Sequence, residues 1–279
     1  MLLGSSARDA LHAQDATSIF AVRSEETAIE FVIGFLVAIA IGLVGMGGGT
    51  IMSPVLILFS GMPPAQAVGT TLLYATAVNF IVFLIYARRG QVHFSTGKWM
   101  LIGGLPGVLI GGLLLAHLNG THAGHRLLYA LLGAIIVFAS LLNMYRLARL
   151  GGVADGRGQN RPRLLSCLMF PVGIETGFSS AGSGVLGSLA MLGFTSLTAA
   201  EVVGTSVFFA LCMTLLGSSI QVFAGNFDVA ILVKLLAGGF VGACVGATLA
   251  TRVPSRPLKW ALAVWLGILG VQLVWRGFS

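Results

Sequence analysis

Two glycine-rich stretches contain the residues that are best suited to bind a ligand. Residues 42–54 read GLVGMGGGTIMSP, and residues 177–185 read GFSSAGSGV. Each glycine costs a helix ~1 kcal/mol relative to alanine, so neither stretch is expected to form a continuous helix. An unwound backbone exposes N–H groups, and a helix that begins after it directs the positive end of its dipole toward it. We therefore predict that both stretches are helix breaks suited to an anion.

A Gly-Thr motif follows each break and could add hydroxyl donors to the same site. The motif reads AQAVGTT over residues 65–71 and AEVVGTS over residues 200–206. Capping of a helix start is the structural alternative for these hydroxyls. Asn79, about two turns further along, is a candidate polar lining residue. The predicted substrate-binding residues are Gly47, Gly48, Gly49, Thr50, Gly69, Thr70, Thr71, Asn79, Ser180, Gly182, Ser183, Gly184, Gly204, Thr205 and Ser206.

The composition indicates that membrane-spanning helices position these residues. Only 9% of the 279 residues are charged, 56% are hydrophobic, and the formal net charge is +7. A soluble domain carries roughly 25% charged residues, so soluble enzymes, disordered chains and nucleic-acid-binding proteins are excluded. Residues 31–87 contain no Asp, Glu, Lys or Arg. The apolar runs suit spanning helices and lack the alternation of barrel strands, so we predict an all-α polytopic membrane protein.

An internal repeat with a spacing of 135 residues organises the chain. It relates Gly69 to Gly204 and places the glycines of the first break on those of the second without a gap. The glycines of residues 103–111 recur over residues 238–246, with a four-residue spacing that suits close helix packing. We predict an N-terminal segment (1–27), a first repeat (28–150), a cytoplasmic linker (151–163) and a second repeat (164–279). Each repeat is expected to contain a first helix broken into a hairpin and three further transmembrane helices.

The placement of Lys and Arg predicts that the two repeats have opposite orientations. Five arginines lie in or beside the linker, which indicates that it is cytoplasmic. The loop near Arg88 is more basic than its counterpart in the second repeat, whereas the loop near Arg256 is more basic than its counterpart in the first. This exchange of charge between equivalent loops is expected of an inverted repeat.

Glu175 is an acidic residue inside an apolar run, two residues before the second break. A carboxylate at membrane depth is costly and is a functional hypothesis by default, so Glu175 is a candidate proton-coupling group. A structural position near the interface is the alternative, because the equivalent residue of the first repeat is Ala40. Glu201 lies beside the second Gly-Thr motif, where an acid at a helix start is favourable in any case.

On these motifs the chain resembles the TauE/SafE sulfite exporter family, also called the TSUP transporters. The resemblance rests on the glycine-rich break that ends at Pro54, on Ala67-x-Gly69-Thr70, and on their counterparts in the second repeat. It covers residues 28–279, although Leu189 replaces the proline in the second repeat. The resemblance implies transport of sulfite, organosulfonates or related sulfur oxyanions, commonly export, driven by an ion gradient.

We therefore expect a secondary transporter of the cell inner membrane that binds its anion at the midplane between the two breaks. A passive anion channel that uses the same helix ends is the alternative. An intramembrane enzyme centred on Ser183 is disfavoured, because no histidine is expected at membrane depth within a spanning helix. No cofactor or metal site is expected, and the chain lacks the motif of a nucleotide-binding loop. The expected partners are a small sulfur-containing anion, the lipid bilayer and a coupling H⁺ or Na⁺; a homodimer is compatible with the sequence.

The orientation can be tested by labelling single cysteines in intact cells, after the native cysteines have been replaced by serine. We expect cysteines placed in residues 151–163, beside Arg88 and beside Arg256 to be protected from an impermeant maleimide, because these basic segments are cytoplasmic. A cysteine in residues 224–230 should react. Protection of that loop as well would contradict the inverted repeat.

Overall fold

The computed structural model describes residues 28–43, 49–119, 124–150, 162–180 and 185–249, and isolated residues between 264 and 275. Every regular element within these ranges is a helix, which confirms the all-α prediction. Four of these helices, α3, α4, α8 and α9, are long and apolar enough to cross a membrane. Their bounds are Pro64–Arg88, Phe94–Asn119, Ala199–Phe223 and Val229–Leu249.

Shorter helices precede these spans at both predicted breaks. The N-terminal helix, Ala28–Leu43, is followed by α2, Gly49–Phe59. In the second half of the chain α6, Pro162–Ser179, is followed by α7, Val185–Phe194. Helix α5, Gly124–Leu150, joins the two halves. Helix α6 begins inside the predicted linker, because proline is favourable in the first turn of a helix.

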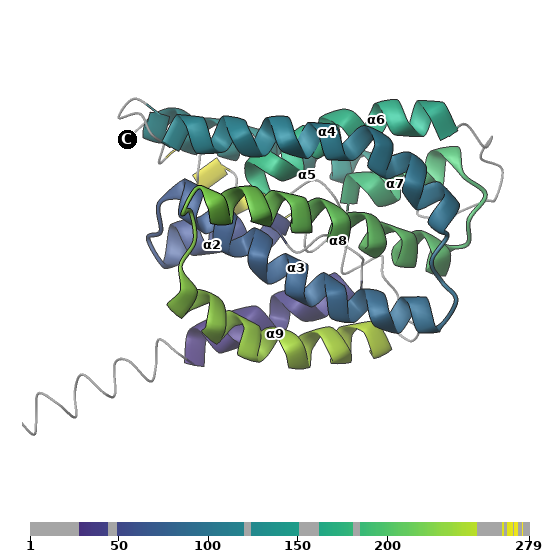
Figure 1. Ribbon diagram of the computed structural model, residues 1–279, viewed down its shortest axis with the longest axis horizontal. Helices are drawn as coiled ribbons and strands as arrows, with labels where there is room; N and C mark the ends of the chain where they lie inside the picture. The colour runs from purple at the N-terminus through teal and green to yellow at the C-terminus, as the bar shows by residue number, and fades with distance from the viewer. Residues whose placement is uncertain are drawn as a thin grey trace, which may run out of the picture.

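The helix order repeats at the spacing found in the sequence. Helices α3 and α8 begin and end 135 residues apart, and α4 and α9 begin 135 residues apart. The α3–α4 connection and the α8–α9 connection lie at opposite ends of the molecule (Figure 1). Each connection contains a glycine with positive φ, Gly90 at 67° and Gly225 at 71°, a backbone conformation that side chains other than glycine rarely adopt.

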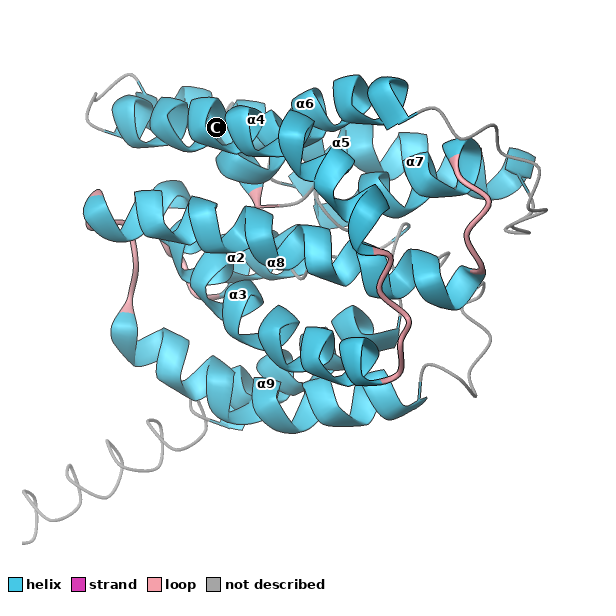
Figure 2. Ribbon diagram, turned by 45° about the vertical axis from the view of Figure 1, so that its right-hand side comes forward, coloured by secondary structure: helices cyan, strands magenta, loops and turns pink. Residues whose placement is uncertain are grey.

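The helices are arranged in three layers, as both ribbon views show (Figures 1 and 2). Helices α4 and α6 form one outer layer, and α9 and the N-terminal helix form the other. Helices α3 and α8 lie between them. Each outer layer therefore pairs the fourth helix of one half with the first helix of the other half.

Glycines allow the helices of each outer layer to approach to backbone contact. A Cβ atom added at Gly107 would overlap the carbonyl oxygen of Phe170, and one added at Gly242 would overlap that of Phe35. The other glycines where an added Cβ atom would overlap backbone atoms of the facing helix are Gly103 and Gly111 on α4, Gly173 and Gly177 on α6, Gly34 and Gly42 on the N-terminal helix, and Gly238 and Gly246 on α9. The predicted packing role of the 103–111 and 238–246 stretches is thus confirmed.

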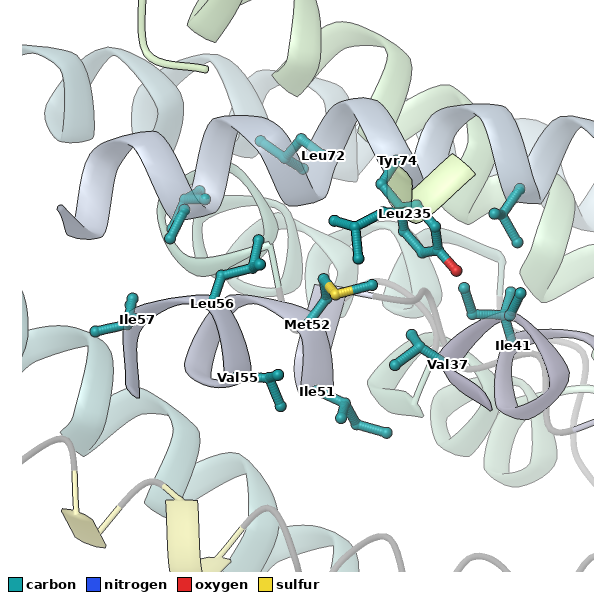
Figure 3. Packing of buried hydrophobic residues seen from close by; sticks show 14 of the residues in the cluster. Val37, Ile41, Ile51, Met52, Val55, Leu56, Ile57, Leu72, Tyr74 and Leu235 are labelled. Carbon is teal, nitrogen blue, oxygen red and sulfur yellow. The ribbon is translucent and has the colours of Figure 1, made fainter. Parts of the chain in front are cut away.

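A large apolar core lies where the N-terminal helix, α2, α3 and α9 meet (Figure 3). Tyr74 of α3 is fully buried there, and its hydroxyl donates a hydrogen bond to the carbonyl oxygen of Gly34. Lys234 of α9 forms an ion pair with Glu30 at 2.8 Å. Labelled members of the core in Figure 3 are Val37, Ile41, Ile51, Met52, Val55, Leu56, Ile57, Leu72, Tyr74 and Leu235.

The glycine contacts predict a large cost for a side chain at Gly107. We expect Gly107→Val to destabilise the fold by about 3 kcal/mol, because the added atoms would push α4 away from the α6 backbone. Thermal denaturation of the detergent-solubilised protein, followed by size exclusion, measures this. Leu109→Val on the exposed side of α4 is the matched control. Equal stability of the two variants would contradict the packing role.

Candidate binding site at the two helix breaks

The two breaks meet inside the molecule, although they lie about 130 residues apart in sequence. Ser180 follows the end of α6, and its Oγ lies 2.6 Å from the Oγ of Ser53 on α2. The same hydroxyl is 3.3 Å from the carbonyl oxygen of Gly49, to which it can donate. A Cβ atom at Gly49 would overlap the carbonyl oxygen of Ser180, so only glycine permits this approach. Ser180 itself has φ of 63°.

A helix N-terminus is present at each break. Helix α2 begins at Gly49 and α7 begins at Val185, and the two helices contain 11 and 10 residues. Free N–H groups and the positive end of the macrodipole lie in the first turn of such a helix. The contact between Gly49 and Ser180 therefore brings the start of α2 to the end of α6, at the other break.

Buried hydroxyls on α2, α3, α7 and α8 are bonded differently in the two halves. In the second half, Ser188 Oγ of α7 donates to Ser206 Oγ of α8 at 2.8 Å. The equivalent residues of the first half are Ser53 and Thr71. Because Ser53 bonds to Ser180 instead, Thr71 Oγ1 is buried without a hydrogen-bond partner in the part of the chain that the structure describes.

Asn79 of α3 is a second buried polar group that lacks a partner. Its side chain is fully buried, and neither its Oδ1 nor its Nδ2 has a hydrogen-bond partner among the described residues. Its counterpart Thr214 is satisfied, since Thr214 Oγ1 donates to the carbonyl oxygen of Ala210 at 2.9 Å. Buried groups of this kind are rare and require an explanation such as a water or a ligand. Thr71 and Asn79 therefore give α3 the polar atoms that a substrate could bind.

The Gly-Thr motifs join the two halves. Thr70 Oγ1 accepts a hydrogen bond from the backbone N–H of Asp228 at 2.9 Å, and Thr205 Oγ1 accepts one from the N–H of His93 at 2.9 Å. Gly69 lies against the carbonyl oxygen of Asn226, where a Cβ atom would overlap it. Gly204 has the same relation to Gln91. These four residues thus form a pair of inter-half clamps, one at the start of α9 and one at the start of α4.

Asp228 and His93 are structural residues that the sequence analysis missed. Asp228 Oδ1 accepts a hydrogen bond from the N–H of Ile231, and His93 Nδ1 accepts one from the N–H of Thr96, so both cap the helix that follows. The available signal was their spacing of 135 residues, each just before a long apolar run. The capping role considered for the Gly-Thr hydroxyls is wrong, because Thr70 and Thr205 lie well inside α3 and α8 and each binds the N–H of the residue that precedes a helix of the other half.

Part of the predicted site lies outside the described residues. Those residues are Gly47, Gly48, Gly182, Ser183 and Gly184. Thr50 is the second residue of α2, and the structure does not describe the position of its side chain. The geometry above therefore rests on Gly49, Ser180 and their neighbours on α2, α3, α7 and α8.

The two acidic candidates lie in different surroundings. Glu175 faces a cavity of about 540 Å³ between α5, α6 and α7, and its Oε1 is buried without a hydrogen-bond partner among the described residues. Glu201 is the third residue of α8, where it forms a capping box with Thr198: the Thr198 N–H donates to Glu201 Oε2 at 2.9 Å. A helix-start role for Glu201, considered from the sequence, is confirmed.

Comparison with known proteins identifies the family of this chain. The model of the family described as "Sulfite exporter TauE/SafE" matches residues 30–273. The chain is 28% identical over 249 residues to the "Probable membrane transporter protein YjnA" of Bacillus subtilis, which covers 86% of this chain and 97% of that protein. It is 23% identical over 265 residues to YunE of the same organism, another "Probable membrane transporter protein". That alignment covers 88% of this chain and 96% of YunE.

A third relative, "Probable membrane transporter protein ORF9" of a Sinorhizobium species, is 28% identical over 255 residues, which cover 88% of this chain and 89% of that protein. No solved structure matches the chain. The family match extends over both halves, including both breaks and both Gly-Thr motifs. The chain is therefore a multi-pass membrane transporter that belongs to the TauE/SafE sulfite exporter family.

Proposed function

We propose that the chain is a secondary transporter that exports sulfite, organosulfonates or related small sulfur oxyanions, with the anion held between the two breaks. The observation that carries this proposal is the contact of Ser180 with Ser53 and Gly49, which brings the breaks together. The family description supports the substrate class. A passive anion channel through the same helix ends is the alternative.

Neutral donors suit an anion that must be released after it has been bound. A buried cation would hold a small oxyanion strongly, whereas hydroxyls, amides and helix N-termini spread a weaker attraction over several groups. We infer that Thr71 and Asn79 donate to the anion, because their side chains are buried and lack other partners among the described residues. The remaining members of the proposed site are Gly47, Gly48, Gly49, Thr50, Ser180, Gly182, Ser183, Gly184 and Ser206.

The roles proposed for Gly69, Thr70, Gly204 and Thr205 differ from those of the other residues. Because they contact the loops of the opposite half, we infer that they hold the scaffold around the site. We infer that the halves form an inverted repeat, each beginning with a re-entrant hairpin. The opposite positions of the α3–α4 and α8–α9 connections support this inference (Figure 1). Alternating access would then open one clamp while the other stays closed.

Glu175 is the proposed proton-coupling group. It is the single titratable side chain among the described residues of α5, α6 and α7 that line its cavity. Because that cavity contains neither Ser53 nor Ser180, Glu175 would act on the breaks through the α6–α7 pair and not by direct contact with the anion. Its protonation would change the cost of moving α6 within the bilayer.

The binding role of Asn79 can be separated from a structural one. We expect Asn79→Leu to weaken sulfite binding at least tenfold while leaving the thermal stability of the apo protein unchanged or higher, because the amide has no partner whose loss would cost stability. The measurement is the stabilisation of purified protein by sulfite, thiosulfate, taurine and sulfoacetate. Thr214→Val, at the equivalent position of α8, is the control.

For Thr214→Val we expect anion affinity close to that of the wild type. The proposed site is wrong if Asn79→Leu binds these anions normally. A structural role for Asn79 would instead show as a lower melting temperature without a specific loss of anion binding.

Proteoliposomes with an imposed pH gradient test the coupling. We expect Glu175→Gln to retain anion binding and to lose the response of anion flux to the gradient, because glutamine keeps the shape of the side chain and cannot release a proton. Wild-type protein should accumulate the anion against its own gradient, and failure to do so would favour the channel. A Glu175→Gln variant that responds fully to the pH gradient would remove this residue from the coupling mechanism.

A further inference from the structure

Two cavities occupy equivalent positions in the two halves. One, of about 540 Å³, lies between α5, α6 and α7; the other, of about 460 Å³, lies beside the N-terminal helix and α2. Their linings correspond at the 135-residue spacing: Val172 and Ala190 of the first cavity correspond to Val37 and Val55 of the second. The pair is therefore part of the repeated architecture, and the differences between the two cavities are informative.

The main chemical difference is one carboxylate. Glu175 lines the cavity of the second half, where Ala40 lines the cavity of the first half. The other residues that line this cavity are apolar, and Glu175 Oε1 is buried without a hydrogen-bond partner among the described residues. An isolated carboxylate in an apolar setting is costly, and a cationic group that reached it would relieve that cost.

We propose that the cavity between α5, α6 and α7 is a binding site for an amphiphilic organic amine. The ammonium group pairs with the carboxylate of Glu175, and the apolar body lies against the side chains of α5 and α7. This site is distinct from the proposed anion site, and the inference does not depend on the transported substrate or on proton coupling.

The size and the access route of the cavity fit such a ligand. Cavities that hold drug-sized molecules have volumes of about 300–1,000 Å³, a range that includes this one. Phe138 of α5 and Leu168 of α6 line the cavity and are 68% and 37% exposed, so the site is accessible from the apolar surface of the protein. A lipophilic amine concentrates in the bilayer, and it would enter from there.

A lipid acyl chain is the competing occupant, and it differs from an amine in one respect. An acyl chain could fill the apolar space, but it would leave the carboxylate without a partner. Discrimination between an amine and a neutral molecule of the same shape therefore separates the two occupants.

The experiment measures binding of 4-phenylbutylamine and of its neutral analogue 4-phenylbutanol to the full-length protein in lipid nanodiscs. Empty nanodiscs of the same composition give the partitioning background. We expect the wild type to bind the amine at least tenfold more tightly than the alcohol. Glu175→Gln should bind the two probes within threefold of each other.

Glu201→Gln is the matched control, because it makes the same chemical change at the exposed start of α8. It should keep the wild-type preference for the amine. Ala134→Phe on α5 retains the carboxylate and fills the cavity, so it should weaken amine binding at least tenfold. This variant keeps the proposal testable if Glu175→Gln does not fold.

Any of three results would overturn the proposal. The first is equal binding of amine and alcohol by the wild type, which would indicate an apolar occupant such as an acyl chain. The second is full amine preference in Glu175→Gln, and the third is unchanged amine affinity in Ala134→Phe. Because the readout is amine binding, loss of anion transport in any variant leaves the result interpretable.

Discussion

The backbone-to-backbone contact between halves is the constraint on which the rest of this structure depends. Within a bilayer, no hydrophobic effect drives one apolar helix against another, so close packing and small residues must hold the helices together. Here glycines bring α4 against α6 and α9 against the N-terminal helix. Both pairs join a helix of one half to the broken element of the other. The position of each break is therefore set by the opposite half, and this is what allows Ser180 to reach Gly49 and Ser53.

The inter-half clamps follow from the same exchange of partners. Once α4 and α9 pack across the molecule, the loops before them reach the starts of α8 and α3. The N–H groups of His93 and Asp228 then need acceptors, because buried backbone donors without a partner are costly in lipid. Thr205 and Thr70 supply these acceptors. The Gly-Thr motifs therefore belong to the scaffold, and the polar atoms left for a substrate are those of neighbouring positions on α3.

Much of this architecture could be predicted from the sequence, but the partner of each helix could not. The charge-free runs predict helices, and the regular glycines of 103–111 predict a close contact on one face of α4. Glycine spacing shows that another helix approaches, yet it does not say which one, so the exchange between halves was not foreseen. The surroundings of Glu175 were missed for a geometrical reason. Ser180 lies beyond the end of α6 with φ of 63°, so helical spacing from Glu175 does not predict the direction of its side chain: the Glu175 carboxylate faces the cavity between α5, α6 and α7, whereas Ser180 contacts Ser53 of α2.

The equivalent positions of the two halves divide into two kinds. Some pairs make the same contact in both halves, as Thr70 and Thr205 do, and these residues hold the scaffold. In other pairs one member is satisfied and the other is not: Thr214 bonds within its own helix, whereas Asn79 lacks a partner among the described residues. A buried polar group without a hydrogen-bond partner destabilises the protein. Because the equivalent residue of the other half is hydrogen-bonded, the fold does not require an unpartnered group at that position. The pairs in which one member lacks a hydrogen-bond partner are therefore not explained by the fold, and the candidate ligand-binding groups lie at those positions.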